Sequence, residues 1–467
     1  MPSELWQLSA AEMAARVRTR EVSARELIDA HLERIASVNP DLNAITIVLE
    51  SEAQEAADAA DAAIARGEPI GPLHGVPMTV KENIDLRGSA TTSGVRANAG
   101  QIAQRDAPHI QQLRAAGAIP IGRTNMPDDG MRWHTESQLY GHTRNPWDAA
   151  RTPGGSSGGD AAALAAGCAP LGMGNDIGGS LRCPSHCCGT VALRPSFARV
   201  CRSNEFGDPN AQYLAAQLMA VHGPMARHVE DLRLAITHMM GPDLRDPRHI
   251  TAPFEGPALP RRVALVPEPE GGSTDPTVAA GVRAAGHALA DAGYEVDERQ
   301  PPSLAEAADR YWQFLLTDLN LAFVEKVRAH AIPDAARVLD LLTANTTLLD
   351  LPGYQRVLGR RAGIRLEWSK FQAEWPLVVG PVFTVPPWPV GWDVESLETN
   401  AAFQESLRFV VTVNFLGLPA VAMPVGLHDG LPQSVQVIGP SFREDACLEA
   451  AACVEERLEP ITPIDPR

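Results

Sequence analysis

The chain has 467 residues, of which 45% are hydrophobic and 21% are charged, and this composition is typical of a globular protein with a sizeable core. The formal net charge is −17, and the chain has no basic run longer than Arg360-Arg361. Because binding to a phosphate backbone needs clustered Lys and Arg side chains, this composition argues against a nucleic-acid partner.

The N-terminal segment does not resemble a targeting sequence. It lacks a basic start followed by an apolar stretch, which predicts that no signal peptide is present. The chain also lacks the run of about 18 apolar residues that a membrane span needs, so we expect no membrane association. The seven cysteines, an odd number in a long chain, indicate reduced thiols. We therefore expect a cytoplasmic protein.

Residues 8–67 are predicted to be mainly helical. Ser23 and Glu26 have the spacing of a capping box, and apolar residues follow them at helical intervals. A helix end is expected at residues 39–41, where proline and two polar residues meet. The apolar and β-branched run 44–49 predicts a strand, and the alanine-rich segment after it predicts a surface helix.

The middle of the chain is predicted to alternate strands and helices. A short apolar strand leads into Lys81, and residues 90–200 alternate short apolar strands with helices of small residues. Residues 240–260 are rich in Pro, Arg and Asp and indicate a surface connection. Residues 262–266 then predict a strand, and residues 275–292 predict a helix. This alternation favours a layered α/β fold.

The C-terminal part begins with a proline-rich segment at residues 375–392, which we expect to be a rigid loop and a pocket wall. Trp388 and Trp392 in this segment suggest an apolar pocket for an aryl or other bulky leaving group. Residues 410–440 have the composition of strands and turns, and residues 444–457 predict a closing helix.

Two glycine-rich loops that carry serine lie close together in the sequence. The first is Pro153-Gly154-Gly155-Ser156-Ser157-Gly158-Gly159-Asp160, and the second is Gly174-Asn175-Asp176-Ile177-Gly178-Gly179-Ser180. Glycine at this density permits a close approach of the backbone or a positive φ. The spacing indicates one shared site, although two ordinary Gly/Ser turns would give the same pattern.

Part of the first loop also matches another hydrolase motif. Gly154-x-Ser156-x-Gly158 fits the nucleophile elbow of α/β-hydrolase esterases, in which His222 or His228 would complete a Ser-His-Asp triad. An elbow must follow a buried strand directly. Residues 142–153 are polar and contain two prolines, so this interpretation is the weaker one.

The longer arrangement resembles the amidase signature family. Three segments carry the resemblance: Gly75-Val76-Pro77-Met78-Thr79-Val80-Lys81-Glu82-Asn83, the loop 154–159, and the segment 174–182. Segments 122–127, 414–420 and 430–436 are also similar to family sequences. The resemblance covers about residues 5–240 and 375–457, and the stretch between them is generic.

The resemblance implies a fold and an activity. Length alone would allow about two or three domains, but the family has one α/β domain, here 1–467, with a large mixed β-sheet flanked by helices on both faces. The signature core would span about 70–200 and the variable middle about 250–370, and residues 375–457 would return to the core. The implied activity is hydrolysis of the C–N acyl bonds of small amides through a covalent acyl-enzyme, without a cofactor.

The resemblance also assigns a catalytic triad by position. Ser180 would be the nucleophile, Lys81 the base, and Ser156 the bridging serine, which follows a cis peptide bond after Gly155. A lysine can act as a base only when it is neutral, so its pKa must fall from about 10.4. The apolar residues around Lys81 in the sequence are consistent with the burial that would lower it.

Further residues would support this triad. The backbone N–H groups of Ile177, Gly178, Gly179 and Ser180 would form the oxyanion hole. Met131 occupies the position of a residue that lines the acyl site, and Ser157 would orient Ser156. Asp176 and Arg182 would form a buried ion pair that fixes the loop, because pairing makes a buried charge tolerable.

Three positions depart from the family pattern. Arg123 replaces a lysine, Asn175 replaces a small Ser or Thr, and His186-Cys187 replaces a pair similar to Ala-Phe. We expect the first change to be harmless. The other two would reshape the pocket, so the substrate of any one family member does not transfer directly.

Two groups of residues invite other interpretations. A zinc site could be imagined at Cys183, His186, Cys187 and Cys188, but no second ligand pair follows, and adjacent cysteines suit tetrahedral binding poorly. We therefore expect no metal and regard these as buried residues beside Ser180. A second group, Tyr311, Trp312 and Phe314, fits either a substrate channel or the core of an amphipathic helix.

Two rival functions remain open at this stage. The chain could be the glutamine-amidase subunit of a tRNA-dependent amidotransferase, or a non-catalytic relative with a binding role. The second rival would be expected to lack Lys81, Ser156 or Ser180, and all three are present. We expect a small-molecule substrate, either an amide or a carbamate (urethane), and leave open a homodimer.

Overall fold

The structure is a computed structural model that describes residues 2–206 and 213–467. The strands in these ranges are β1 (Ile45–Val48), β2 (Pro77–Lys81), β3 (Ile119–Thr124), β4 (Glu136–Ser137), β5 (Gly141–His142), β6 (Leu171–Asp176), β7 (Val191–Arg194), β8 (Val221–Ala226), β9 (Arg262–Leu265), β10 (Glu295–Glu298), β11 (Leu377–Pro381), β12 (Ala420–His428) and β13 (Leu431–Ile438). Eleven of them form one mixed sheet in the order β1-β3-β2-β6-β8-β7-β12-β13-β11-β9-β10, and β4 pairs with β5.

The helices of the described chain lie between these strands. They are α1 (Ala10–Arg18), α2 (Ala24–Leu42), α3 (Glu50–Arg66), α4 (Pro108–Ala115), α5 (Gly158–Ala165), α6 (Arg182–Cys188), α7 (Leu214–Met219), α8 (Val229–Thr237), α9 (Pro276–Asp291), α10 (Leu304–Ala322), α11 (Val324–His330), α12 (Pro333–Ala344), α13 (Leu351–Glu374), α14 (Leu397–Ser406), α15 (Arg408–Leu416) and α16 (Glu444–Glu455). Short 3-10 turns occur at η1 (Pro2–Gln7), η2 (Arg96–Asn98), η3 (Asp128–Gly130) and η4 (Trp392–Val394). None of the helices in the described ranges is both long and apolar enough to cross a membrane.

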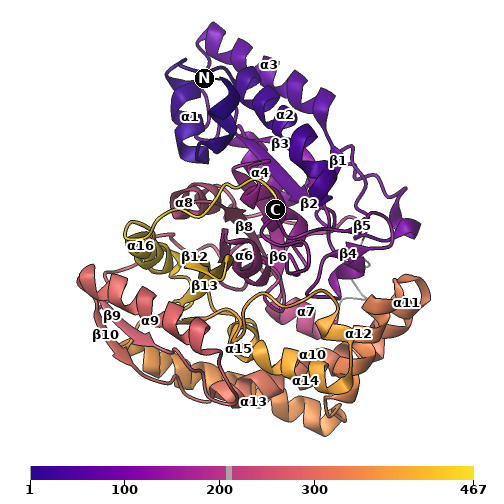
Figure 1. Cartoon of the computed structure of the whole chain (residues 1–467), viewed down its shortest axis with the longest axis vertical. Helices are drawn as coiled ribbons and strands as arrows, with labels where there is room; N and C mark the ends of the chain where they lie inside the picture. Colours follow the sequence, from indigo (N-terminus) through magenta and orange to yellow (C-terminus); the bar gives the residue numbers. More distant parts are fainter. Residues whose placement is uncertain (1, 207–212) are drawn as a thin grey trace.

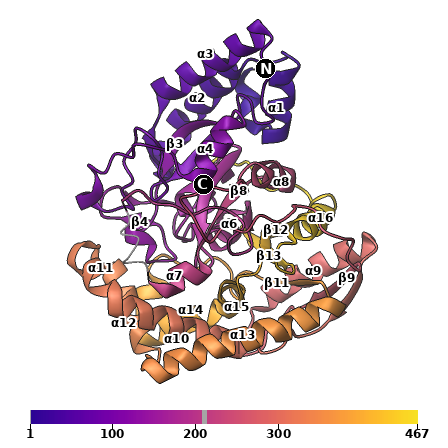
Figure 2. The ribbon, with the colours of Figure 1, turned by 180° about the vertical axis from the view of Figure 1, so that it is seen from behind.

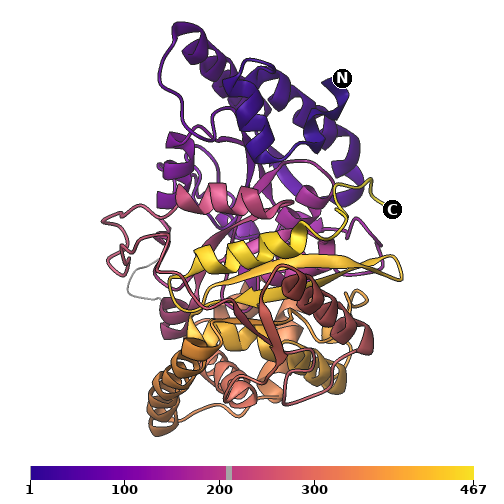
Figure 3. The same ribbon diagram turned by 90° about the vertical axis from the view of Figure 1, so that its left-hand side faces the viewer.

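Helices cover both faces of the sheet, as the family resemblance implies. Along β12, Ala420 and Ala422 belong to one hydrophobic core, whereas Val421 and Met423 belong to a second. Successive side chains of a strand point to opposite faces, so the two cores lie on opposite sides of the sheet. The first core includes residues of α5, α6, α10 and α15, and the second includes residues of α1, α8, α9 and α16. The side view shows α16 lying along the strands at one face (Figure 3).

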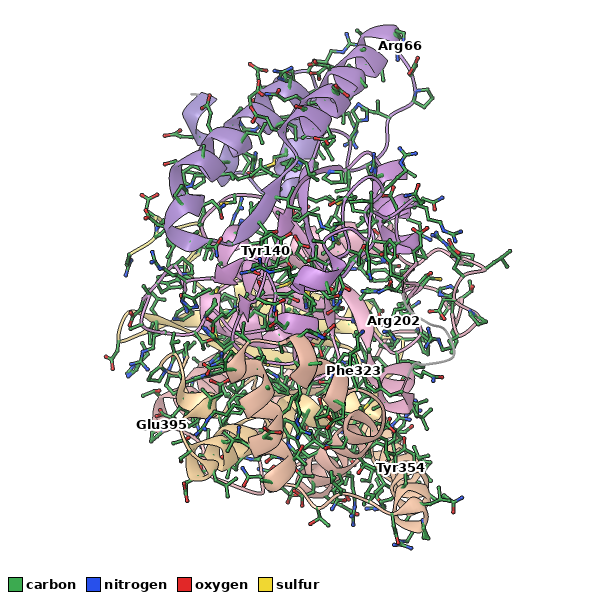
Figure 4. The ribbon with its side chains drawn as sticks, turned by 90° about the vertical axis from the view of Figure 1, so that its right-hand side faces the viewer. Arg66, Tyr140, Arg202, Phe323, Tyr354 and Glu395 are labelled. Carbon is green, nitrogen blue, oxygen red and sulfur yellow. The ribbon has the colours of Figure 1, made fainter. Side chains whose placement is uncertain are left out.

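The helices outside the sheet gather at the two ends of the molecule. The N-terminal helices α1–α3 lie at one end of the long axis, and α10–α14 lie at the other (Figures 1 and 2). Arg66, at the end of α3, and Tyr354, on α13, mark these opposite ends (Figure 4). The loops at the ends of β2 and β6 lie between the two groups of helices.

Several predicted elements are confirmed by the structure. Ser23 and Glu26 form the capping box at the start of α2. The strands predicted at 44–49 and 262–266 are β1 and β9, and the predicted helix 275–292 is α9. Residues 241–260 contain no helix or strand, in agreement with a surface connection.

Two predictions for the C-terminal part are wrong in detail. Residues 408–416 form helix α15 instead of a strand, because a short apolar run that is buried on all sides fits either element and its tertiary position decides. The proline-rich segment is not a loop throughout, since residues 377–381 form β11, which pairs with β13 and β9. Pro376 and Pro381 lie at its two ends, where the missing N–H groups interrupt the ladder least.

Candidate active site

Lys81 lies at the centre of the candidate site, fully buried at the end of β2. Its Nζ lies 2.7 Å from Ser156 Oγ, 2.9 Å from Ser157 Oγ and 2.9 Å from Asn175 Oδ1. Strand β2 pairs in parallel with β6, so the end of β6 that carries Asn175 lies beside the end of β2 that carries the lysine. The pairing of β2 with β6 thus places the second glycine-rich loop beside the Lys81 amine, which the two serines of the first loop also contact.

The first glycine-rich loop presents its two serines to the lysine just before helix α5. The Gly155–Ser156 peptide bond is cis, as the family resemblance implies. No strand leads into this loop, since residues 143–157 contain neither helix nor strand. The structure thus lacks the strand that a nucleophile elbow requires. Ser157 N–H donates to the carbonyl oxygen of Ser180 at 3.2 Å, which joins the two loops directly.

The second loop is fixed by a buried ion pair. Asp176 and Arg182 are both fully buried, and Arg182 Nε lies 3.1 Å from Asp176 Oδ2. Arg182 also donates to Asn414 Oδ1 at 2.6 Å and to Gln436 Oε1 at 2.7 Å, which ties the loop to α15 and β13. The Arg182 guanidinium helps to hold the pKa of the Asp176 carboxyl well below its usual range, against the opposing effect of burial. Ser180 lies between Asp176 and Arg182 in the sequence, and only 6% of the residue is exposed.

The backbone amides of this loop differ in their partners. Gly179 N–H donates to Asp176 Oδ1 at 2.8 Å, and so one of the four amides expected in the oxyanion hole is engaged by the protein. Within the described residues, 2–206 and 213–467, the N–H groups of Ile177, Gly178 and Ser180 have no hydrogen-bond acceptor. These three amides are available to a substrate oxygen.

Two aromatic side chains bind the carbonyl oxygens of the same turn. Trp133 Nε1 donates to Gly178 O at 2.7 Å, and the Tyr311 hydroxyl donates to Ile177 O at 3.2 Å. A Cβ at position 178 would collide with the Tyr311 hydroxyl, so this close packing requires glycine. Tyr311, Trp312 and Phe314, on α10, all belong to the hydrophobic core, and the Tyr311 hydroxyl also contacts the turn. Their expected part in a substrate channel stays a prediction.

Burial decides the charge of Lys81. Loss of hydration lowers the pKa of Lys81 from 10.5 to about 7, and the carboxylates of Asp160 and Asp176 act in the opposite direction. Asp160 is itself fully buried, which raises its pKa to about 6. Its Oδ1 accepts a hydrogen bond from Thr79 Oγ at 3.0 Å. Burial therefore favours the neutral form of Lys81, which is able to accept a proton.

Some residues of the site were not assigned a role from the sequence. Asn175 accepts from Lys81 and donates through Nδ2 to Asn83 Oδ1 at 2.7 Å. Arg123 is buried, and its Nη2 donates to the carbonyl of Lys81 at 3.0 Å, which steadies the end of β2. In the sequence, both positions depart from the family pattern, and this departure is the feature that could have indicated a role in the site. No feature of the sequence around Trp133 indicates that its side chain contacts the second glycine-rich loop.

The turn that carries Met131 passes beside Ser156. A Cβ at Gly130 would lie 3.5 Å from Ser156 Oγ, and the neighbouring Met131 is half-buried against the hydrophobic core. Asp129 Oδ2 lies 2.6 Å from His330 Nε2, so α11 is fastened to this turn. The expected role of Met131 in lining the acyl site stays a prediction.

Neither histidine proposed for a Ser-His-Asp triad contacts a serine of the site in the part of the chain that the structure describes. The buried ring of His222 stacks on His109 with centroids 4.4 Å apart. His228 lies 4.0 Å from Glu455, on α16. The structure therefore gives no support to the esterase alternative.

The cysteines considered for zinc are buried on α6. Cys183, Cys187 and Cys188 are fully buried, and burial raises the pKa of each thiol. His186 packs against Phe383, with ring centroids 5.4 Å apart. Within the described ranges, no three His, Cys, Asp or Glu side chains are grouped so that they could hold a metal ion.

One side of the proline-rich segment lines a surface depression, and the other side packs into the interior. Residues 385–389 and Trp392 line a surface depression of about 690 Å³ together with Trp147 and Arg151. The buried ring of Trp388 packs inward on Phe403, at 5.3 Å between centroids, and Phe403 packs on Trp133 at 5.6 Å. The inner side of this segment is thus linked by aromatic contacts to the residue that binds Gly178.

Known proteins resemble the chain in sequence and in fold. Residues 26–448 match the family described as Amidase. The chain is 40% identical over 458 residues to an indoleacetamide hydrolase of Bradyrhizobium diazoefficiens, an alignment that covers 97% of this chain and 87% of that protein. It is 33% identical to one of the subunits of the glutamyl-tRNA(Gln) amidotransferase of Salinispora arenicola, over 99% of each chain. The structure of a bacterial aryl acylamidase of the amidase signature family superposes with a TM-score of 0.83, at 25% identity and over 96% of each chain.

Proposed function

The chain belongs to the amidase signature family and is a hydrolase of carbon–nitrogen amide bonds, and we propose that its substrates are arylacetamides and related small aryl amides. The observation that carries the proposal is the contact of Lys81 Nζ with Ser156 at 2.7 Å, in a chain that is 40% identical to an indoleacetamide hydrolase. We assign Ser180 as the nucleophile, Ser156 as the proton bridge and Lys81 as the base.

The contacts of Lys81 fit the role of a base. A neutral amine has two hydrogens and one lone pair, so it can donate to Ser157 Oγ and Asn175 Oδ1 and accept from the Ser156 hydroxyl. As Ser180 Oγ attacks the carbonyl carbon, its proton passes to Ser156, and the Ser156 proton passes to Lys81 Nζ. The carbonyl π electrons move to oxygen, and the N–H groups of Ile177, Gly178 and Ser180 would stabilise the resulting oxyanion.

The reaction is completed by the reverse transfer. Lys81 returns the proton through Ser156 to the leaving nitrogen, the C–N bond breaks, and an acyl ester remains on Ser180. A water molecule then attacks this ester with the same proton relay, and the products are the carboxylic acid and ammonia or an amine. Each proton removed from a nucleophile is delivered to a leaving group, so the cycle restores neutral Lys81.

An aromatic substrate is supported by the surroundings of the oxyanion turn. Trp133 packs on Trp312 at 5.7 Å between ring centroids and on Phe403 at 5.6 Å. We extend the proposal to small aryl carbamates, because attack on a carbamate develops the same oxyanion from the same nucleophile. Glutamine, which is small and polar, would gain little from an aromatic environment.

The substrate proposal is tested by comparing kcat/KM for indole-3-acetamide, an acetanilide, a small aryl carbamate, glutamine and acetamide. We expect the aryl substrates to be cleaved at least about 10-fold better than glutamine and acetamide, a difference of about 1.4 kcal/mol in transition-state binding. A preference for glutamine would instead support the amidotransferase alternative.

The catalytic assignment is tested with a fluorophosphonate probe, which bonds only to an activated nucleophile. Peptide mapping should place the adduct on Ser180, and Ser180→Ala should abolish labelling and turnover. Ser156→Ala and Lys81→Ala should each lower kcat severely, and the effects should not add, because the three groups act as one unit. An adduct on Ser156, with Ser180→Ala still active, would overturn the assignment.

A further inference from the structure

The turn that carries the oxyanion amides contains two peptide groups whose oxygens point into aromatic side chains. Ile177 O accepts from the Tyr311 hydroxyl at 3.2 Å, and Gly178 O accepts from Trp133 Nε1 at 2.7 Å. In a trans peptide the C=O and the following N–H point in opposite directions. A hydrogen bond to the oxygen of one residue therefore sets the direction of the N–H of the next residue.

The two peptide groups are not held equally. The peptide between Gly178 and Gly179 is fixed at both sides, because its oxygen accepts from Trp133 and its N–H donates to Asp176 Oδ1 at 2.8 Å. The peptide between Ile177 and Gly178 is fixed at its oxygen by Tyr311, and its N–H has no acceptor among the residues that the structure describes. The free N–H of Gly178 is thus oriented by a single side chain.

We propose that Tyr311 is a positioning residue for catalysis: its hydroxyl, bound to Ile177 O, aims the Gly178 N–H at the developing oxyanion. This inference rests on the proposed function, since it requires that Ser180 attack a carbonyl beside the turn. It also gives a role to the segment 250–370, which looks generic in the sequence, because Tyr311 belongs to α10 in that segment.

The surroundings of Tyr311 suit this role. The side chain is fully buried, and its ring packs edge-on against Trp312 with centroids 5.1 Å apart, so the hydroxyl is held in one place. Burial raises the pKa of the Tyr311 phenol well above its usual value, which keeps the proton that the hydrogen bond needs. Position 178 is glycine, which leaves the space in which the hydroxyl can reach the neighbouring carbonyl.

The test is Tyr311→Phe, which removes the hydroxyl and keeps the ring. Loss of a complete oxyanion donor costs about 100- to 1000-fold in kcat, so loss of its orientation should lower kcat about 10- to 100-fold and change KM less than about threefold. The affinity for an arylboronic acid, which forms a tetrahedral adduct on Ser180, should fall by a similar factor. The affinity for indole-3-acetate, a product that develops no oxyanion, should stay within about threefold of the wild-type value.

Two matched variants distinguish a loss of orientation of the Gly178 N–H from a loss of side-chain packing around the turn. Trp133→Phe removes the other carbonyl contact, but Asp176 still holds that peptide, so its effect on kcat should be smaller than that of Tyr311→Phe. Tyr354→Phe removes a hydroxyl that donates to Asp318 Oδ1 on the same helix α10, away from the turn, and should leave kcat unchanged. Melting temperatures should be measured for all variants to establish that they are folded.

Each outcome decides the proposal. A wild-type kcat in Tyr311→Phe, or equal losses in affinity for the boronic acid and for the product, would overturn the role of Tyr311 and leave the proposed function standing. Absence of turnover and of Ser180 labelling in the wild-type protein would refute the proposed function itself.

Discussion

Lys81 shows how the environment of one residue can favour the neutral form of an ordinary cation. Its nitrogen has three polar neighbours, Ser156, Ser157 and Asn175, and none of them carries a charge that would hold the ammonium form. The two nearby carboxylates, Asp160 and Asp176, oppose the effect of burial but do not cancel it. The result is a pKa of about 7, close to the working pH that suits a general base.

The activity should depend on the protonation state of Lys81, and therefore on pH. Because the reaction needs neutral Lys81, kcat/KM should rise with pH through a step near 7. The carboxylate of Asp160 raises the pKa of Lys81, so Asp160→Asn should lower it and move the step to lower pH. The measurement is kcat/KM of both proteins from about pH 5 to about pH 9, in buffers of constant ionic strength so that charge screening stays the same.

A buried carboxylate elsewhere serves as the control for this variant. Asp231 is fully buried and accepts hydrogen bonds from the N–H groups of Ala10 and Ala11, at the N-terminal end of the molecule. Asp231→Asn should leave the position of the step unchanged. A step that moves to higher pH in Asp160→Asn would contradict the assigned influence of Asp160 on Lys81.

The turn between β6 and α6 depends on the ion pair of Asp176 and Arg182. Both partners are fully buried, and Asp176 also accepts from the N–H groups of Gly179 and Leu181. The pair thus shapes the turn and fastens it to α15 and β13 through Arg182. A pair of this kind adds little to stability by itself, but the loss of one partner leaves an unpaired buried charge.

We therefore predict that Arg182→Met lowers the free energy of unfolding by about 3–5 kcal/mol. Arg283→Met is the matched control, because Arg283 lies on the surface, 3.1 Å from Glu268 and 2.9 Å from Glu298. Exposed pairs contribute about 0–1 kcal/mol each, so this variant should lose far less. Urea denaturation measures both values, and similar losses in the two variants would show that the buried pair has no special role.

Helix α6 also permits a prediction about metals. Its cysteines are buried beside Ser180, and they are not grouped with further ligands in the described ranges. If the two serines and Lys81 carry the chemistry, exhaustive chelation should leave kcat unchanged within error. A strong loss of activity that zinc restores would identify a metal site at these cysteines.

The candidate site lies at the ends of β2 and β6, between the N-terminal helices α1–α3 and the helices α10–α14 at the other end of the molecule (Figure 1). Strand β2 carries Lys81 and the turn after β6 carries Ser180. Tyr311 on α10 contacts the turn after β6, and His330 on α11 contacts Asp129 in the turn beside Ser156. The variable middle of the sequence is therefore part of the structure around the site. The expected division of residues 1–467 into a core and a variable middle stays a prediction.

This arrangement leads to a prediction about independence. The chain carries all the groups proposed for catalysis, so the purified single chain should hydrolyse indole-3-acetamide without tRNA or another protein. Size-exclusion chromatography with activity measured in each fraction tests this directly. Activity that appears only after addition of partner proteins and tRNA would favour the amidotransferase alternative.

The sequence by itself indicated the class of fold, and the family resemblance of its motifs supplied the proposed triad positions. The glycine-rich loops and the segment before Lys81 are local patterns, so they can be read without knowing which strands pair. The same holds for the capping box of α2, and for the ion pair of Asp176 and Arg182, which lie six residues apart. Local interactions of this kind are encoded in short stretches of chain.

Only the tertiary structure decided which distant side chains complete the site. Residues 410–416, expected within a region of strands and turns, fold as part of α15, because burial on all sides overrides the preference of a short apolar run. Tyr311 and Trp133 reach the oxyanion turn from 134 and 45 residues away along the chain. Contacts at such separations depend on how the sheet and its helices pack, and no short sequence pattern records them.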